Sequence, residues 1–204
     1  MMASMLPEKL LLVDLSRALV RAWAEAFEDF EQVSIVVHEV DFFAHPADAM
    51  TSPANSFGIM DGGLDLAIRN VLGFNAQRAA QAVILERHHG ELPVGAAEIV
   101  ETGHASWPYL VVAPTMRVPE NVAPTLNPYL AFRAALLAVR RFNEAAGRVV
   151  IHSLLCPGLG TGIGGVEPRR CALQMRMALK HVLEPARIPS FSRIHEVHRA
   201  LRMA

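Results

Sequence analysis

Short apolar runs and longer amphipathic segments alternate along the chain. Apolar runs bounded by turn residues predict strands at residues 9–13, 33–37, 49–51, 98–101, 109–113 and 148–155. Apolar residues recurring every three or four positions predict helices at residues 15–30, 64–72, 76–90, 129–147 and 168–182. This alternation is typical of an α/β protein with a mostly parallel sheet. The strands at 33–37 and 149–155 are expected at the centre of that sheet.

No internal repeat or low-complexity linker divides the chain of 204 residues, which is a usual size for one large domain. A single domain is therefore expected over residues 1–183, followed by a C-terminal appendage at 184–204. The stretch 187–202 is locally basic and could contact RNA or an acidic partner. A solvated, partly frayed tail fits this stretch better.

Composition narrows the class of protein. Apolar residues make up 52% of the chain, and 19 basic residues nearly balance 20 acidic ones. These values exclude a disordered chain and give no general attraction to nucleic acid or to an anionic membrane. The chain has no apolar run long enough for a membrane span, and its first residues lead us to expect no signal peptide. Two cysteines are too few for a disulfide framework or a zinc site, so a cytoplasmic protein without a metal or other cofactor is expected.

Five glycines lie between the last predicted strand and the last predicted helix: Gly158, Gly160, Gly162, Gly164 and Gly165. Glycine permits positive φ and lets backbone N–H groups approach a ligand. Successive N–H groups near a helix N-terminus form a site for phosphate or pyrophosphate, to which the Thr161 hydroxyl would add a donor. A dinucleotide fingerprint is a poor match, because that loop follows the first strand of its fold. A phosphate-binding loop is predicted, and the alternative is a tight turn that only reverses the chain.

A second glycine-rich segment, SPANSFGIMDGGLD at residues 52–65, follows a short predicted strand. In open α/β sheets, ligands bind beyond the carboxyl ends of the strands. The Asn55 amide can donate and accept hydrogen bonds, as a ribose hydroxyl requires. Asp65 falls in the first turn of a predicted helix, where the helix dipole favours an ionised carboxylate. The segment is predicted to form part of the same site, and the alternative is an Asn turn followed by helix-capping carboxylates.

Four motifs follow one another along the chain. They are VDFFAHPADAMTSPAN at residues 40–55, MDGGLDLAI at 60–68, LPVGA at 92–96 and LGTGIGGV at 159–166. Together they resemble the motifs of the macrodomain family. The motif sequences are most similar to those of a bacterial and phage branch associated with phage tails. The resemblance implies a three-layer α/β/α sandwich with a mostly parallel, mixed central sheet.

The resemblance also implies that ADP-ribose, or a protein carrying it, is the partner. The implied binding residues are Asp41, Phe42, Asn55, Gly62, Gly63, Leu64, Gly160, Thr161, Gly162, Ile163, Gly164 and Gly165. Asp41 would accept a hydrogen bond from the adenine amino group, and Phe42 would pack on the base. The two glycine segments would clamp the diphosphate.

Asn55 and Asp65 are the implied catalytic residues of an enzyme that hydrolyses mono-ADP-ribosyl or ADP-ribose ester linkages. Ser52 stands where the family has an asparagine, and Asp61 replaces a glycine. The absence of a lysine in the site region, and of a Glu-Glu pair after the glycines, counts against the branches that form a lysine adduct or cleave poly(ADP-ribose). The alternatives are a catalytically inactive ADP-ribose reader and a phage-derived structural or assembly module.

Overall fold

Six strands form one sheet in the computed structural model, which describes residues 5–203. They are β1 (Lys9–Asp14), β2 (Ser34–Glu39), β3 (Ala49–Ser52), β4 (Glu98–His104), β5 (Trp107–Val112) and β6 (Ser153–Cys156). Their order is β2-β1-β6-β3-β5-β4, and every neighbouring pair is parallel except β4–β5. Residues 1–4 and 204 lie outside the described residues. Residues 1–4 are the start of the predicted domain, where no signal peptide is expected. Residue 204 is the last residue of the predicted appendage.

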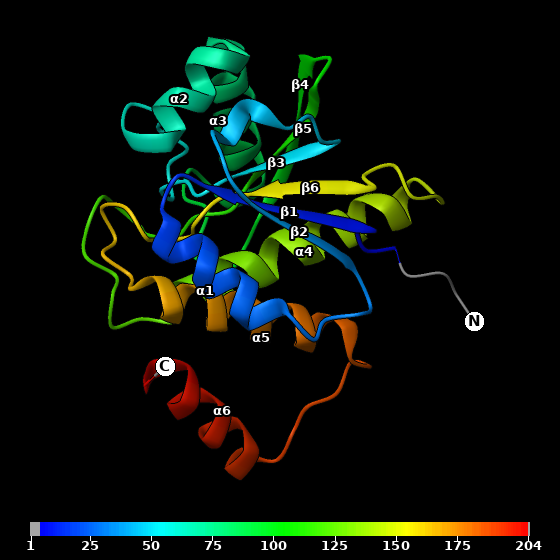
Figure 1. Cartoon of the computed structure of the whole chain (residues 1–204). Helices are drawn as coiled ribbons and strands as arrows, with labels where there is room; N and C mark the ends of the chain where they lie inside the picture. The colour runs from blue at the N-terminus through cyan, green and yellow to red at the C-terminus, as the bar shows by residue number, and fades with distance from the viewer. Residues whose placement is uncertain (1–4, 204) are drawn as a thin grey trace.

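Helices cover both faces of the sheet (Figure 1). They are α1 (Arg17–Phe27), α2 (Gly63–Leu72), α3 (Phe74–His88), α4 (Asn127–Ala145), α5 (Pro168–Leu183) and α6 (Phe191–Met203), with a 3-10 turn η1 (Phe42–Ala44). Helices α1, α4 and α5 pack on one face, and α2 and α3 lie over the other. The predicted α/β/α sandwich with a mixed, mostly parallel sheet is confirmed. No helix within residues 5–203 is long and apolar enough to cross a membrane.

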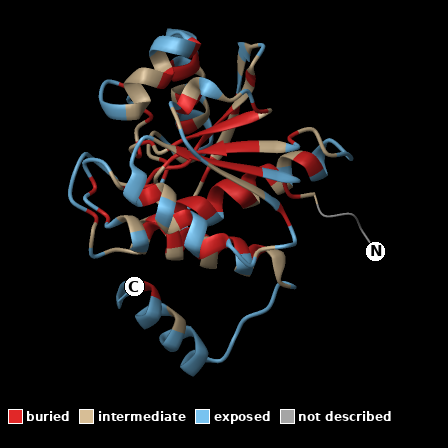
Figure 2. Cartoon of the chain, viewed as in Figure 1, coloured by how far each residue is buried: buried red, intermediate tan, exposed pale blue. Residues whose placement is uncertain are grey.

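The sheet is buried on both faces (Figure 2). On β1, Leu10 and Leu12 belong to the core beneath α1, α4 and α5, together with Trp23. Leu11 and Val13 belong to the core beneath α2 and α3. Each side chain that is fully buried in this way stabilises the fold by about 1.5–3 kcal/mol. An unbroken apolar run is the pattern expected of a parallel strand covered by helices on both faces.

The apolar run at 33–37 is not central, so that prediction was wrong. Its strand, β2, lies at the edge of the sheet, and β1 is the only described strand with which it pairs. Ser34, His38 and Glu39 are exposed, and the residues between them are only partly buried. β1 is as long as β2, but its residues 10–13 are all buried, whereas β2 has the exposed residues expected at an edge.

The strand predicted at 148–155 is central but shorter than expected, because β6 includes only its last residues. Side chains satisfy the backbone that precedes β6. Asn143 of α4, which is fully buried, accepts a hydrogen bond from the Ile151 N–H at 3.0 Å. The Asp48 carboxylate accepts one from the His152 N–H at 2.9 Å. These N–H groups therefore need no neighbouring strand.

The appendage predicted after residue 183 contains the helix α6, where a frayed tail was expected. Leu201 is buried against the body of the protein, and the Gln174 side chain of α5 donates a hydrogen bond to the Leu201 carbonyl at 3.0 Å. Most other residues of α6 are exposed. The helix thus rests on α5 through a narrow contact.

Candidate functional site

The carboxyl ends of β1, β6, β3 and β5 lead into loops that enclose a cavity of about 390 Å³. The loop after β6 brings Pro157 to this cavity, the loop after β3 brings Pro53, and the loop after β5 brings Thr115. Most of the predicted site residues line it: Asn55, Gly62, Gly63, Leu64, Asp65, Gly160, Thr161, Gly162, Ile163 and Gly164. The two glycine-rich segments, about 100 residues apart in sequence, therefore face each other at one end of the sheet.

The predicted phosphate loop folds back on itself between β6 and α5. The Val166 N–H donates to the Gly160 carbonyl and the Gly165 N–H to the Gly162 carbonyl, both at 3.0 Å. Gly160 and Gly165 have φ values of +71° and +65°, which favour glycine. The backbone N–H groups of residues 161–164 donate no hydrogen bond to any other described residue. Because these residues line the cavity, their N–H groups can bind an anion there.

The glycines of this loop have different structural roles. A Cβ at Gly164 would lie 2.5 Å from the Gly160 carbonyl oxygen and 2.8 Å from a methyl of Val122. A Cβ at Gly158 would collide with side chains of α1 and of the loop itself. At Gly162 a Cβ would meet nothing within 4 Å. Packing therefore requires glycine at 158 and 164, whereas a side chain at 162 would have free space.

The second glycine segment leads into the N-terminus of α2. Gly62 is the N-cap in an extended conformation, and Gly63 has a φ of +54°. Gly62, Gly63, Leu64 and Asp65 all line the cavity. The first N–H groups of a helix have no partner within it, and the helix dipole there favours a negative charge. The start of α2 is thus a second place for an anion in the same cavity.

Asp65 lies in the first turn of α2 and turns its carboxyl group toward β3. The Ser52 hydroxyl donates a hydrogen bond to Asp65 Oδ1 at 2.6 Å. Burial raises the pKa of Asp65 to about 6, the Ser52 hydrogen bond opposes this rise, and the negative charge of Asp61 adds to it. Oδ2 of Asp65 has no hydrogen bond to another described residue. A carboxyl group that titrates near neutrality can take up or release a proton during a reaction.

The Asn55 side chain is used within its own loop. Its Nδ2 donates to the Ile59 carbonyl at 2.7 Å, and its Oδ1 accepts from the N–H groups of Phe57 at 3.1 Å and of Ile59 at 3.3 Å. Asn55 therefore orders residues 55–59, of which Asn55 and Ile59 line the cavity.

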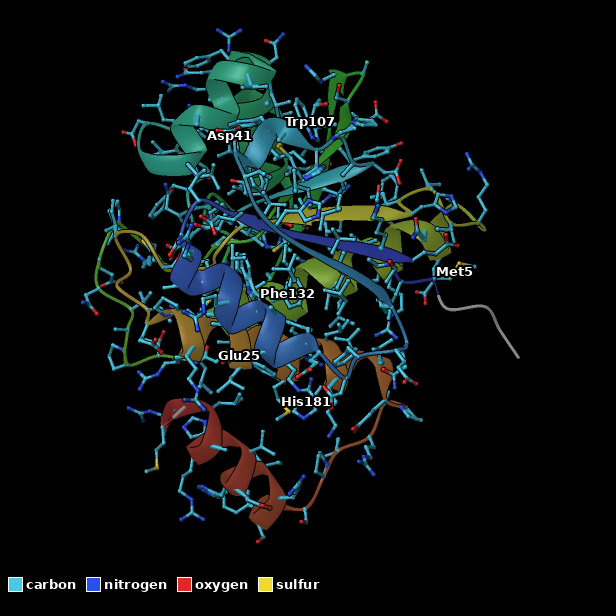
Figure 3. The ribbon with its side chains drawn as sticks, in the orientation of Figure 1. Met5, Glu25, Asp41, Trp107, Phe132 and His181 are labelled. Carbon is cyan, nitrogen blue, oxygen red and sulfur yellow. The ribbon has the colours of Figure 1, made fainter. Side chains whose placement is uncertain are left out.

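Three predicted binding residues do not line this cavity. Asp41 is exposed beyond the end of β2 (Figure 3), and its carboxylate accepts a hydrogen bond from the Phe43 N–H at 2.8 Å. Phe42 is buried in the core beneath α2 and α3. Gly165 is not among the lining residues, and a Cβ there would lie 3.0 Å from the amide nitrogen of Asn121.

One end of the cavity lies beside α1 and is not predicted from the sequence. Asp14, Ser16 and Leu19 line this end. The Asp14 carboxylate accepts hydrogen bonds from the Ser16 N–H at 2.8 Å and from the Gly158 N–H at 3.4 Å. The available signal was an aspartate directly after the apolar run at 9–13. That signal does not reveal that this run lies beside the strand leading into the phosphate loop.

Comparisons with known proteins show to which family the chain belongs. A family model described as Macro domain matches residues 51–175. A protein of Aeropyrum pernix is 35% identical over 134 residues, which cover 65% of this chain and 63% of that protein, less than two thirds of its length.

Two solved structures show the same fold at low sequence identity. The macrodomain of Mycobacterium tuberculosis DarG has a TM-score of 0.58 and 18% identity, and the match covers 71% of this chain and 89% of that chain. A variant of the Oceanobacillus iheyensis macrodomain solved with ADPR has a TM-score of 0.50 and 19% identity, covering 65% and 70%. Because the family model covers more than half of the chain, this protein belongs to the macrodomain family.

Proposed function

We propose that this protein binds ADP-ribose, free or attached to a protein, in the cavity between the phosphate loop and α2. One observation carries the proposal: residues 161–164, whose backbone N–H groups donate to no other described residue, and the first residues of α2 line one cavity of about 390 Å³. Two adjacent sets of N–H groups suit the two phosphates of a diphosphate. The Oceanobacillus macrodomain variant solved with ADPR supports a ligand of this class.

The spacing of three residues supports the same assignment. Solved variants of the Oceanobacillus macrodomain replace an asparagine, a glycine seven residues later and an aspartate three residues after that. Asn55, Gly62 and Asp65 have the same residue types at the same spacing. This shared spacing supports the proposal that the three residues belong to the ligand site.

The adenine base would occupy the end of the cavity beside β1 and α1. There the Asp14 carboxylate would accept a hydrogen bond from the exocyclic amino group, and Leu19 would offer apolar contact. Asp41, which the family resemblance suggests for this role, lies outside the cavity lining. Asp14 is therefore the better candidate for selecting adenine over guanine.

We further propose that the protein hydrolyses mono-ADP-ribosyl linkages, including ester linkages, at the Asp65 end of the cavity. Water would add to the anomeric carbon of the distal ribose while the bond from that carbon to the modified side chain breaks. Asp65 Oδ2 would accept the proton of the water and pass it to the leaving oxygen, while Ser52 holds Oδ1. With a pKa of about 6, this carboxyl group is mostly ionised at neutral pH and can act as the base. Asn55 would act indirectly, by holding the loop.

An ADP-ribose reader without turnover is the second candidate. The observation in its favour is the Asn55 amide, which is bonded within its own loop and is therefore not free to orient water beside Asp65. A reader would use the same phosphate and adenine contacts.

Calorimetric titration with ADP-ribose tests the binding proposal, for which we expect a micromolar dissociation constant and much weaker binding of GDP-ribose. Release of ADP-ribose from a mono-ADP-ribosylated protein tests the enzyme proposal. Asp65→Asn keeps an acceptor for Ser52 and should slow release by about 100-fold or more with little change in affinity. Binding without release from several linkages would identify a reader. Absence of binding would overturn the proposal and leave a structural or assembly module.

A further inference from the structure

A second cavity, of about 880 Å³, is lined by residues of α4, α5 and α6 and of the segment between α5 and α6. Helix α6 lies beside α5 at the C-terminal end of the chain (Figure 1). We call this cavity the α6 groove. It shares no described lining residue with the candidate ADP-ribose cavity. Its apolar lining includes Leu137 of α4, Met177 of α5, and Ile194 and Leu201 of α6. The groove thus combines a large volume with an apolar floor.

Positive charges from three parts of the chain surround this floor. Arg133 and Arg140 come from α4, Lys180 comes from α5, and Arg187 and Arg193 come from the C-terminal segment. Glu184 is the only carboxylate among the described lining residues, and it pairs with Arg187 at 3.2 Å. Arg193 pairs with Glu196 at 2.7 Å. Within residues 5–203, no carboxylate forms an ion pair with either α4 arginine or with Lys180, so the groove has an excess of positive charge.

The side chain of His181 lies close to several of these positive charges. It lies on α5 on the side facing α6 (Figure 3), and its Nδ1 is 3.0 Å from the Tyr129 hydroxyl oxygen of α4. Burial lowers the pKa of His181, and the charges of Lys180, Arg133 and Arg193 lower it further, against the opposing charge of Glu184. Cations from α4, α5 and α6 thus act on one imidazole.

We propose that the α6 groove is a second ligand site, which binds a phosphate ester with the phosphate between Arg133, Lys180 and His181. A dianion would neutralise charges that the described residues leave unbalanced, and guanidinium groups match phosphate oxygens in pairs. The organic part of the ester would lie on the apolar floor, where removing its surface from water adds affinity. This site is separate from the proposed ADP-ribose site, and neither depends on the other.

The experiment follows the His181 imidazole by NMR, assigned by comparison with His181→Gln, in the full-length protein. The probes are inorganic phosphate and phenyl phosphate, each titrated at constant ionic strength against sodium chloride. A bound dianion favours the imidazolium, so saturation should raise the pKa of His181 by about one unit. Phenyl phosphate should act at about tenfold lower concentration than inorganic phosphate, because it also covers the apolar floor.

Arg133→Gln and Lys180→Gln separate a ligand site from a general salt effect. Each variant should raise the pKa of His181 in the absence of phosphate, because a neighbouring positive charge is removed, and should abolish most of the further rise. Arg148→Gln, at an exposed position outside the groove, should behave as the wild type. An unchanged His181 pKa at saturating phosphate, equal responses in Arg133→Gln and Arg148→Gln, or equal potency of the two probes would overturn the proposal.

Discussion

At the scale of single residues, Asp65 links the candidate site to the stability of the fold. Its pKa is about 6 in the folded protein and 3.8 as a free side chain. Between these two pH values the folded state binds more protons than the unfolded state, so the free energy of unfolding falls as the pH rises. Above pH 6 the loss is complete and amounts to about 3 kcal/mol at most. The protein therefore keeps an ionised carboxylate at this position at the expense of stability.

Replacing Asp65 by Asn should remove that loss and leave the Ser52 hydrogen bond in place. We expect Asp65→Asn to raise the melting temperature at pH 8 and to have little effect at pH 4, where the native carboxyl group is protonated. Thermal melts followed by circular dichroism at both pH values test this expectation. Glu25→Gln, at an exposed position on α1, provides the control. An equal gain at the two pH values would show that ionisation of Asp65 is not the cause.

Asp14 and Asp41 are the two candidates for the residue that accepts a hydrogen bond from the adenine amino group. Asp14→Asn keeps an oxygen that can accept from the Ser16 N–H but adds a donor facing the base, so discrimination between ADP-ribose and its inosine analogue should fall by about tenfold. Asp41→Asn should change it little. Calorimetry with the two nucleotides on both variants decides the matter. If only Asp41→Asn loses discrimination, the sequence-based assignment is right and Asp14 has a structural role.

These residues also show how far the sequence can be used to predict the site. Motif spacing singled out Asp65 and the glycine loop, both of which line one cavity, because both motifs depend on local sequence. It did not reveal Asp14, whose place in the cavity depends on β1 lying beside β6. Nor did it reveal that Phe42 is buried, because an aromatic residue next to an aspartate suits a core position and a base-stacking position equally well.

At the scale of elements, the phosphate loop offers a test that separates binding from folding. Gly162→Glu adds a side chain where there is open space, so the fold should be retained, but its bulk and charge should abolish ADP-ribose binding. Gly164→Ala places a methyl group against the Gly160 carbonyl and should destabilise the protein by about 1–3 kcal/mol. Urea unfolding and calorimetry measure the two effects. Undiminished binding by Gly162→Glu would show that this loop is not the phosphate site.

The strands show the limit of prediction from hydrophobic patterns. The runs at 9–13 and 33–37 are both apolar and short. No feature of the local sequence indicates which of the two strands has two neighbours in the sheet. Strand order follows from the packing of helices on both faces, which depends on residues far apart in sequence. The strand predicted at 148–155 was too long for a related reason, because the side chains of Asn143 and Asp48 pair with its backbone.

At the scale of the whole molecule, the expected division into a domain and an appendage predicts unequal local stability. Helix α6 has one buried residue, Leu201, whereas α5 lies across the core. Hydrogen exchange measured by mass spectrometry should therefore show exchange in residues 191–203 well before residues 168–183. Saturating phenyl phosphate should slow exchange in the first segment if the α6 groove is a ligand site. Simultaneous exchange of both segments would make α6 an integral part of the domain.

The position of β1 in the sheet has a consequence for how the protein folds. One edge of β1 pairs with β2, which follows soon after it, but the other edge pairs with β6, with Lys9 opposite Ser153. During synthesis on the ribosome, that second edge must wait for a partner made 144 residues later. An early unit of two parallel strands joined by α1 is thus followed by late, long-range pairing with β6, which slows folding and leaves an apolar strand edge open to other nascent chains. The need for chaperones would then depend on how soon β6 is synthesised. The same strand leads into the phosphate loop.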